Sequence, residues 1–142
     1  MPTYTDPPGM PDDERMTPAE FQTVREYLGL SGPWLASYLG VSYKTIQHWQ
    51  SGRFPVPDGV RLTLEELEER TAQFVDAVAR SVNTRDEPGD AVVETYRSDE
   101  EYRAAHPDAE FPASWHRMVV ARVAQQVPAL SIVYAVREAA RA

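Results

Sequence analysis

Hydrophobic residues recur at helical spacing between positions 17 and 82 and predict four helices. The first begins at TPAE (17–20), which has the form of a capping box with proline at the first helical position, and ends near Gly29. Two short helices follow within 31–52. A long helix then spans 58–82, where six residues form a stripe at intervals of four and three: Val60, Leu64, Leu67, Thr71, Phe74 and Val78.

After position 90 the pattern changes to short runs rich in β-branched residues. The segments 91–96 and 130–134 predict two strands. Between them, Ser98 begins a short helix and Ser114 begins a longer one, which Pro128 ends. The order β-α-α-β indicates a small α/β unit. Two strands are marginal alone, and pairing with a second copy would stabilise them, which favours a dimer.

The two short helices within 31–52 are joined by a tight turn, and the residues around that turn are specific. Gly40 follows the first helix at a place where a positive φ costs glycine almost nothing, and Ser42 is a natural N-cap for the second helix. Ile46 and Trp49 are three apart and are expected to point into the core. Four residues give the first helix one apolar face: Trp34, Leu35, Tyr38 and Leu39. This layout is typical of a DNA-binding helix-turn-helix, although a helical hairpin in a structural domain has the same outline.

The second of these helices leaves polar residues on its outer face. They offer hydrogen-bond donors, acceptors and a positive charge, which is the chemistry that meets base edges and phosphates. Arg53, in the loop that follows, is well placed to touch a phosphate. We therefore predict these DNA-binding residues: Ser42, Tyr43, Lys44, Thr45, Gln47, His48 and Arg53.

This stretch resembles the phage-repressor and Cro (Xre) class of helix-turn-helix regulators. The resemblance rests on the spaced residues Ala36, Gly40, Val41, Ile46, Trp49 and Gly52, and on the flanks TPAEFQTVREYLGLS and HWQSGRFPVP. It covers residues 16–82 and implies sequence-specific binding to double-stranded DNA. The sequence departs from the class at Gly32-Pro33, where the class usually offers a longer polar side chain towards a phosphate.

The second half is similar to small bacterial or phage autoregulators, including anti-CRISPR-associated regulators. The shared features are a strand, the segment YRSDEEYRAAHP, a Trp-containing helix and a second strand. In those proteins the C-terminal part dimerises, so the resemblance implies a homodimer built mainly by residues after about position 82. The residues expected to join two copies are Phe74, Val78, Val92, Tyr96, Trp115, Ile132 and Tyr134.

The predicted fold is therefore mainly α, with an N-terminal helix-turn-helix bundle followed by a small C-terminal α/β dimerisation unit. Residues 1–15 are acidic and proline-rich and are predicted to be a disordered tail. The DNA-binding domain spans 16–82, and NTRDEPGD (83–90) has the composition of a linker. The dimerisation domain spans 91–142.

The net charge of −8 argues at first sight against DNA binding, because nucleic-acid-binding domains are usually basic. The charge is uneven, however. Counting Lys and Arg against Asp and Glu, residues 17–57 carry +1, whereas 1–16, 58–82 and 83–142 each carry −3. The acidic remainder should weaken non-specific binding and make the affinity sensitive to salt. It also leaves protein partners or DNA mimicry open.

Other chemistry finds little support in the sequence. There is no cysteine, which excludes disulfides and thiolate metal sites. None of the three histidines has a second histidine at metal-ligand spacing, and His116 beside Trp115 is interpreted as a packing or interface residue. Tyr96 and Tyr102 could line a pocket but are more typical of a core. No phosphate-binding glycine loop is present, and we predict no enzyme, metal or cofactor.

No apolar run approaches the length of a transmembrane helix, and the N-terminus lacks the apolar core of a signal peptide, so a cytoplasmic protein without membrane contact is expected. The leading hypothesis is a transcriptional regulator, an autoregulatory repressor that binds an inverted repeat as a homodimer. One alternative is an antitoxin or partner-binding protein that uses its C-terminal half. Another is an effector domain with a C-terminal ligand pocket.

Overall fold

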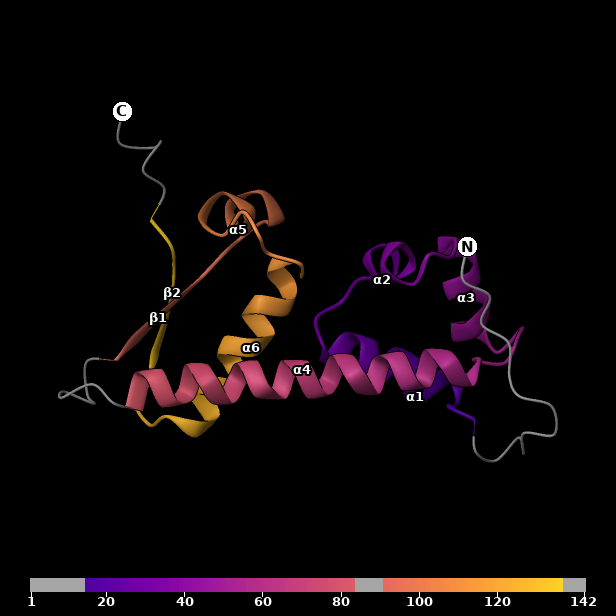
Figure 1. The fold of residues 1–142 in the computed structure, drawn as a ribbon, viewed down its shortest axis with the longest axis horizontal. Coiled ribbons are helices and arrows are strands. Elements are labelled where there is room, and N and C mark those ends of the chain that lie inside the picture. The colour runs from indigo at the N-terminus through magenta and orange to yellow at the C-terminus, as the bar shows by residue number, and fades with distance from the viewer. Residues whose placement is uncertain (1–14, 84–90, 137–142) are drawn as a thin grey trace. The chain divides into compact units, whose positions relative to one another are not determined.

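The structure, a computed structural model, describes residues 15–83 and 91–136. It is mainly helical with one small two-stranded sheet, so the predicted fold class is confirmed. Figure 1 shows the elements, which in chain order are α1 (Pro18–Tyr27), α2 (Gly32–Leu39), α3 (Tyr43–Ser51), α4 (Asp58–Asn83), β1 (Val92–Thr95), α5 (Asp99–Ala105), α6 (Ala113–Gln126) and β2 (Ser131–Tyr134).

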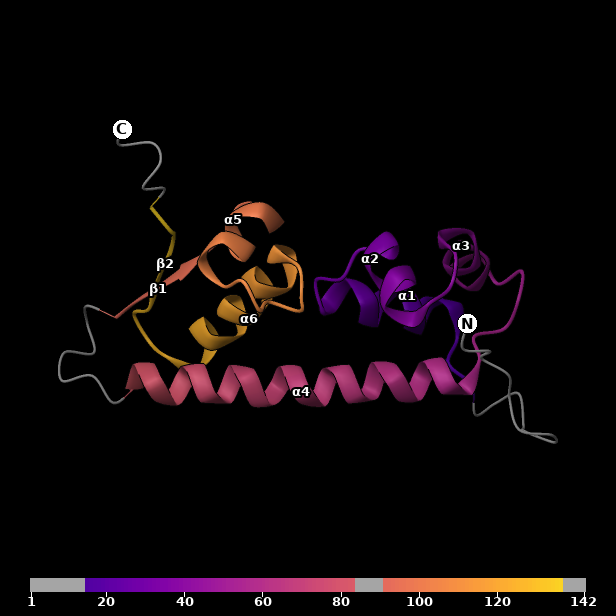
Figure 2. The same ribbon diagram turned by 45° about the horizontal axis from the view of Figure 1, so that its top comes forward.

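The chain divides into two compact units, and the boundary lies between Arg70 and Thr71, inside α4. The first unit contains α1, α2, α3 and the first part of α4. The second contains the rest of α4 together with β1, α5, α6 and β2 (Figure 2). The predicted domain ranges, with a tail before 16 and a linker at 83–90, stay a prediction. Residues 1–14 and 84–90, which hold nearly all of that tail and linker, lie outside the described residues.

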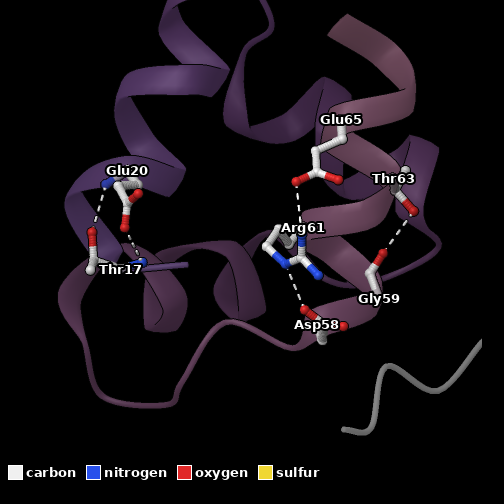
Figure 3. Close-up of polar contacts among 7 residues, drawn as sticks. All are labelled: Thr17, Glu20, Asp58, Gly59, Arg61, Thr63 and Glu65. Carbon is white, nitrogen blue, oxygen red and sulfur yellow. Dashed lines mark hydrogen bonds and ion pairs between the residues drawn. The ribbon is translucent and has the colours of Figure 1, made fainter. Parts of the chain in front are cut away.

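Short-range polar contacts define the beginnings of α1 and α4 (Figure 3). The Thr17 hydroxyl accepts a hydrogen bond from the Glu20 backbone N–H at 3.0 Å, and the Glu20 carboxylate accepts one from the Thr17 N–H at 3.0 Å, so the predicted capping box is confirmed. In α4 the Arg61 guanidinium donates to Asp58 at 2.6 Å and to Glu65 at 2.7 Å. All these partners are three or four positions apart, the spacing at which helix residues become neighbours.

The residues expected at the ends of α2 and α3 are found there. The Ser42 hydroxyl accepts a hydrogen bond from the Thr45 N–H at 3.2 Å and caps α3. Gly40 ends α2 with a φ of +72°, in the left-handed region that glycine adopts readily. Gly52 ends α3 with a φ of +82°. The predicted tight turn between two short helices is therefore confirmed.

The core of the first unit is formed by side chains from one side of each of its helices. Its fully buried side chains include Phe21, Leu28, Leu35, Leu39, Ile46, Val60 and Leu64. The predicted apolar face of α2 is wrong in part, because Trp34 and Tyr38 lie beside the buried side, where their rings stack at 5.1 Å and Tyr38 is exposed. Successive helix residues are about 100° apart, so Leu35 and Leu39 can be buried while the residues just before them, Trp34 and Tyr38, are not.

The apolar stripe along α4 is buried in its first part, as expected of core residues, whereas its last two positions, which were expected to join two copies, are exposed or partly exposed. Its first four positions are buried: Val60, Leu64, Leu67 and Thr71. Phe74, in contrast, is 40% exposed and Val78 is partly exposed. The buried positions beyond Thr71 are Val75, Ala79 and Val82. A step of four after Thr71 keeps the buried side aligned, because an α-helix has about 3.6 residues per turn and drifts from a strict heptad.

The second unit is built around β1 and β2, which pair in parallel with Val92 opposite Ser131 and Thr95 opposite Tyr134. Parallel neighbours need a crossover connection, and α5 and α6 provide it. α6 packs against both strands, and α5 packs against α6 (Figure 1). Both predicted strands and both predicted helices are therefore present, in the predicted order.

The start of α6 differs from the prediction. The helix begins at Ala113, and its N-cap position is Pro112 rather than Ser114. The Asp99 carboxylate, at the start of α5, accepts a hydrogen bond from the Ala113 N–H at 2.7 Å. A carboxylate at this place also interacts favourably with the helix dipole. The group that satisfies the helix start thus comes from another element, beyond the reach of a local pattern.

Thr71 is a buried polar residue whose hydroxyl accepts a hydrogen bond from the Trp115 indole N–H at 3.1 Å. Thr71→Val deprives that buried N–H of this acceptor, so we expect the free energy of unfolding to fall by about 1–3 kcal/mol. Urea unfolding of the full chain measures the change. The matched control is Thr63→Val, because the Thr63 hydroxyl donates to the Gly59 carbonyl within α4 and is only part-buried. Equal losses in the two variants would contradict the assigned role of Thr71.

Candidate nucleic-acid interface

One side of α3 packs into the core of the first unit, and the other side is exposed to solvent. Ile46 is fully buried, and Trp49 is 5% exposed with its ring edge-to-face against Phe21 at 5.8 Å. α3 packs against both α1 and α2. The exposed side carries three of the predicted DNA-binding residues: Tyr43, Lys44 and Gln47. The apolar side therefore fixes the helix, and the polar side is left for a partner.

Ser42 and Thr45 occupy the start of α3 and use their hydroxyls there. The two oxygens are 2.9 Å apart and share a hydrogen bond, while the Ser42 hydroxyl also caps the helix. The first turn of a helix carries partial positive charge on its backbone N–H groups. Ser42 and Thr45 thus lie at the end of α3 that carries this partial positive charge.

The other end of α3 carries an aromatic and cationic edge that the sequence predicted only in part. The His48 ring meets the Phe54 ring at 5.0 Å, and the Arg53 guanidinium lies 5.8 Å from the centre of the Phe54 ring. Phe54 is 51% exposed, so a large apolar ring stands at the surface beside two predicted DNA-binding residues. Phe54 was not among the predicted DNA-binding residues. The signal that could have found it is an aromatic residue next to a cation, directly after the glycine that ends the helix.

Two exposed cations belong to this surface. Lys44 lies on α3 and Arg53 lies just beyond it. Two arginines elsewhere in the first unit have structural partners: Arg25 is part-buried and donates to a side chain of α3 at 3.0 Å and to a backbone carbonyl at 2.9 Å, and Arg61 lies between two carboxylates of α4. Arg25 contributes to the net +1 of residues 17–57, but its charge serves to join α1 and α3 rather than to face a ligand.

The sequence matches the model of the Aca2/YdiL-like family over residues 16–130. The chain belongs to the Aca2/YdiL-like family. The Aca2 repressor of Pectobacterium phage ZF40 is 30% identical over 116 residues, which are 81% of this chain and 91% of the relative. These likenesses support a phage-type regulator. The matched range includes every element from α1 to α6, and therefore the whole of the candidate interface.

In this Aca2/YdiL-like chain the residues expected at a dimer contact fall into two groups. Tyr96 and Trp115 are buried inside the second unit, where they belong to its own core. The exposed group lies on the strands and on α4, and it consists of Val92, Ile132 and Tyr134 together with Phe74 and, in part, Val78. A contact between copies can therefore use the second group directly, while the first supports the elements that carry it.

The surface around β2 is open and largely apolar. All four residues of β2 are exposed, and Ile132, Val133 and Tyr134 are each exposed by more than 40%. Each strand of a two-stranded sheet is an edge strand, with backbone groups available on its outer side. Beside β2 lies a hollow of about 230 Å³ lined by Thr95, Arg117, Val120, Ile132, Val133 and Tyr134. The second unit thus offers another chain a strand edge next to an apolar hollow.

Two tyrosines and two histidines form a compact cluster in the second unit: Tyr96, Tyr102, His106 and His116. The Tyr96 hydroxyl is 2.9 Å from His106 Nε2, and His116 Nδ1 is 2.8 Å from the Thr95 hydroxyl. Burial lowers the pKa of His116 to about 4, and the neighbouring His106 contributes to the shift, so the His116 ring is neutral near pH 7. Tyr96 and Tyr102 are buried, as expected of core residues, while Tyr102, His106 and His116 also line a hollow of about 450 Å³, so the alternative of a pocket stays open.

Among residues 15–83 and 91–136, no group of His, Asp and Glu side chains is arranged to hold a metal ion. The helices of the same ranges include none that is long and apolar enough to cross a bilayer. The chemistry that these residues do assemble in the first unit is a polar helix side, two exposed cations and an exposed aromatic ring.

Proposed function

We propose that this chain is a sequence-specific DNA-binding repressor that binds an inverted repeat as a homodimer and controls its own expression. The observation that carries the proposal is the construction of α3. Its polar side, with Lys44 and Gln47, is open, and its opposite side is anchored in the core by Ile46 and Trp49. Membership of the Aca2/YdiL-like family and likeness to a protein named a repressor support it.

In this proposal α2 and α3 are a helix-turn-helix of the phage-repressor and Cro class, and α3 enters the major groove. The Gln47 amide suits a bidentate pair with adenine, and the Lys44 ammonium suits guanine or a phosphate. Arg53 lies beyond the end of α3, where it contacts a phosphate, and His48 faces the groove beside it. Ser42 and Thr45 hold the start of the helix against the DNA.

The homodimer follows from the small reach of a single motif. One recognition helix contacts only a few base pairs, so two copies are needed for useful specificity. A two-fold axis would place the two α3 helices about 34 Å apart, one turn of DNA, over the halves of an inverted repeat. The exposed strand residues Val92, Ile132 and Tyr134 supply the proposed contact between copies.

Gln47→Ala tests the assignment of the recognition helix. We expect the affinity for the preferred site to fall by about 1–3 kcal/mol and discrimination to be lost at one position of each half-site. The preferred site is first obtained by selection from a random duplex library with the full chain, and then compared with a footprint on the DNA upstream of its own gene. Gln125→Ala is the matched control, because Gln125 is an exposed glutamine on α6 in the second unit.

The outcomes separate two failures. A full chain that selects no common sequence would contradict the proposed function. A chain that selects one, but whose Gln47→Ala variant keeps every base preference, would contradict only the role given to Gln47. Protection of the upstream DNA of its own gene is the result expected of an autoregulator.

A further inference from the structure

Gly32 stands where no other residue would fit without displacing a neighbouring ring. A Cβ atom built on Gly32 would lie 2.5 Å from Cε2 of Tyr43 and 3.3 Å from its Cδ2. The backbone does not require glycine here, because the positive φ angles among the described glycines belong to Gly29, Gly40 and Gly52. Gly32 is also buried although it is the first residue of α2. The Tyr43 ring therefore lies in the space that a side chain at position 32 would occupy.

The start of α2 has few backbone donors left for a ligand. Pro33 carries no N–H, and the Trp34 N–H donates to the Ser31 hydroxyl at 3.1 Å. The Tyr43 ring, which lies against Gly32, brings a further group able to donate to this place, the Tyr43 hydroxyl. Tyr43 is 45% exposed, and its hydroxyl makes no hydrogen bond with the residues in 15–83 and 91–136. A rigid ring thus holds an available hydroxyl at the point where α2 and α3 both begin.

We propose that Gly32 is a positioning residue that seats the Tyr43 ring, and that the Tyr43 hydroxyl then donates to a phosphate of the DNA backbone. The inference rests on the proposed function and adds a contact to it. Tyr43 is the first residue of α3 and its ring lies sideways against α2, whereas Gln47 follows one turn further along the same side of α3. A donor at this end of α3, beside α2, suits a contact with a phosphate. Such a contact fixes the position of the helix on the DNA without reading the base sequence.

Three variants of the full chain test the proposal: Gly32→Ala, Tyr43→Phe and the double variant. Their affinities are measured for the selected operator and for a duplex of unrelated sequence. Tyr43→Phe removes the donor, and we expect roughly tenfold weaker binding to both duplexes. Gly32→Ala should give a similar loss by moving the ring, and the double variant should bind no more weakly than either single one. Base preferences should be unchanged in all three.

Gly32→Ala is informative because it should not harm the fold. Alanine limits the unfolded chain more than glycine does, and the ring that its Cβ would displace belongs to a side chain that is 45% exposed and can turn towards solvent, so the melting temperature should stay close to that of the wild type. Gly59→Ala, a substitution at the second residue of α4, is the matched control and should keep wild-type affinity. Weaker binding by a variant that is at least as stable can only reflect the changed surface.

Three results would overturn the proposal while leaving the proposed function standing. They are wild-type affinity of Gly32→Ala, losses that multiply in the double variant, and a loss in Tyr43→Phe confined to one base pair. The last would show that Tyr43 reads a base. A wild-type chain that prefers no DNA sequence would instead remove the proposed function on which the inference rests.

Discussion

Replacing Trp49 by alanine is expected to lower the free energy of unfolding by about 3–5 kcal/mol, the range for removing a large aromatic side chain from a core. Trp49 is 5% exposed and packs edge-to-face on Phe21 of α1. With Ile46 it makes up the buried side of α3. Since whole domains are stable by only about 5–15 kcal/mol, the loss should leave α3 frayed or the first unit largely unfolded.

The measurement is urea unfolding of the full chain, followed by circular dichroism, with the two units allowed separate transitions. Trp34→Ala is the matched control, because Trp34 is only partly buried and stacks on the exposed ring of Tyr38. It should cost clearly less than Trp49→Ala. A Trp49→Ala chain with an unchanged midpoint would show that α3 is held in some other way.

The features of the first unit that could be predicted from the sequence are those fixed within one helical turn. The capping box at Thr17, the cap at Ser42 and the left-handed glycine at Gly40 all depend on partners three to five positions away. Such contacts leave a signature of residue types at fixed spacing. This is why the order of the helices and the turn before α3 were predicted correctly, and why the exposed side of α3 was found.

The features that escaped prediction depend on partners far along the chain. Asp99 accepts the first N–H of α6 from 14 positions away, and Tyr43 fills the space above Gly32. Gly32 was interpreted as a departure from a known pattern, because its reason lies in another helix. Phe54 was missed for a related cause: whether an aromatic residue in a loop is buried or exposed is decided by tertiary packing.

The second unit shows the same division. Its strands and helices follow from local pattern, but the burial of Tyr96 and Trp115 follows from the packing of α6 on the sheet and on the later turns of α4. Both were expected at a contact between copies, because interfaces and cores are built from the same types of apolar residue, and residue type alone does not distinguish them. The structure leaves Val92, Ile132 and Tyr134 exposed, so the proposed contact becomes narrower than the sequence suggested.

Ile132→Glu is expected to dissociate the proposed homodimer at micromolar concentration. Ile132 is 42% exposed in the middle of β2, beside the apolar hollow that Thr95 and Val120 help to line. If two copies meet there, a two-fold axis places two carboxylates in one contact, and burying an unpaired carboxylate costs several kcal/mol. A weakening of about 100-fold or more in the dimer dissociation constant should result. Light scattering and sedimentation of the full chain measure it.

Leu62→Glu is the matched control, because Leu62 is a similarly exposed apolar residue, at 52%, but lies on α4 in the first unit. The Leu62→Glu chain should remain a dimer, like the wild type. The Ile132→Glu chain should remain folded, since Ile132 lies outside the buried core, and it should bind an inverted repeat far more weakly than the wild type while still recognising a half-site. A wild-type chain that is monomeric at micromolar concentration would remove the dimer from the proposed function. An Ile132→Glu chain that still dimerises would instead place the contact away from β2, with Phe74 on α4 as the next exposed apolar residue to test.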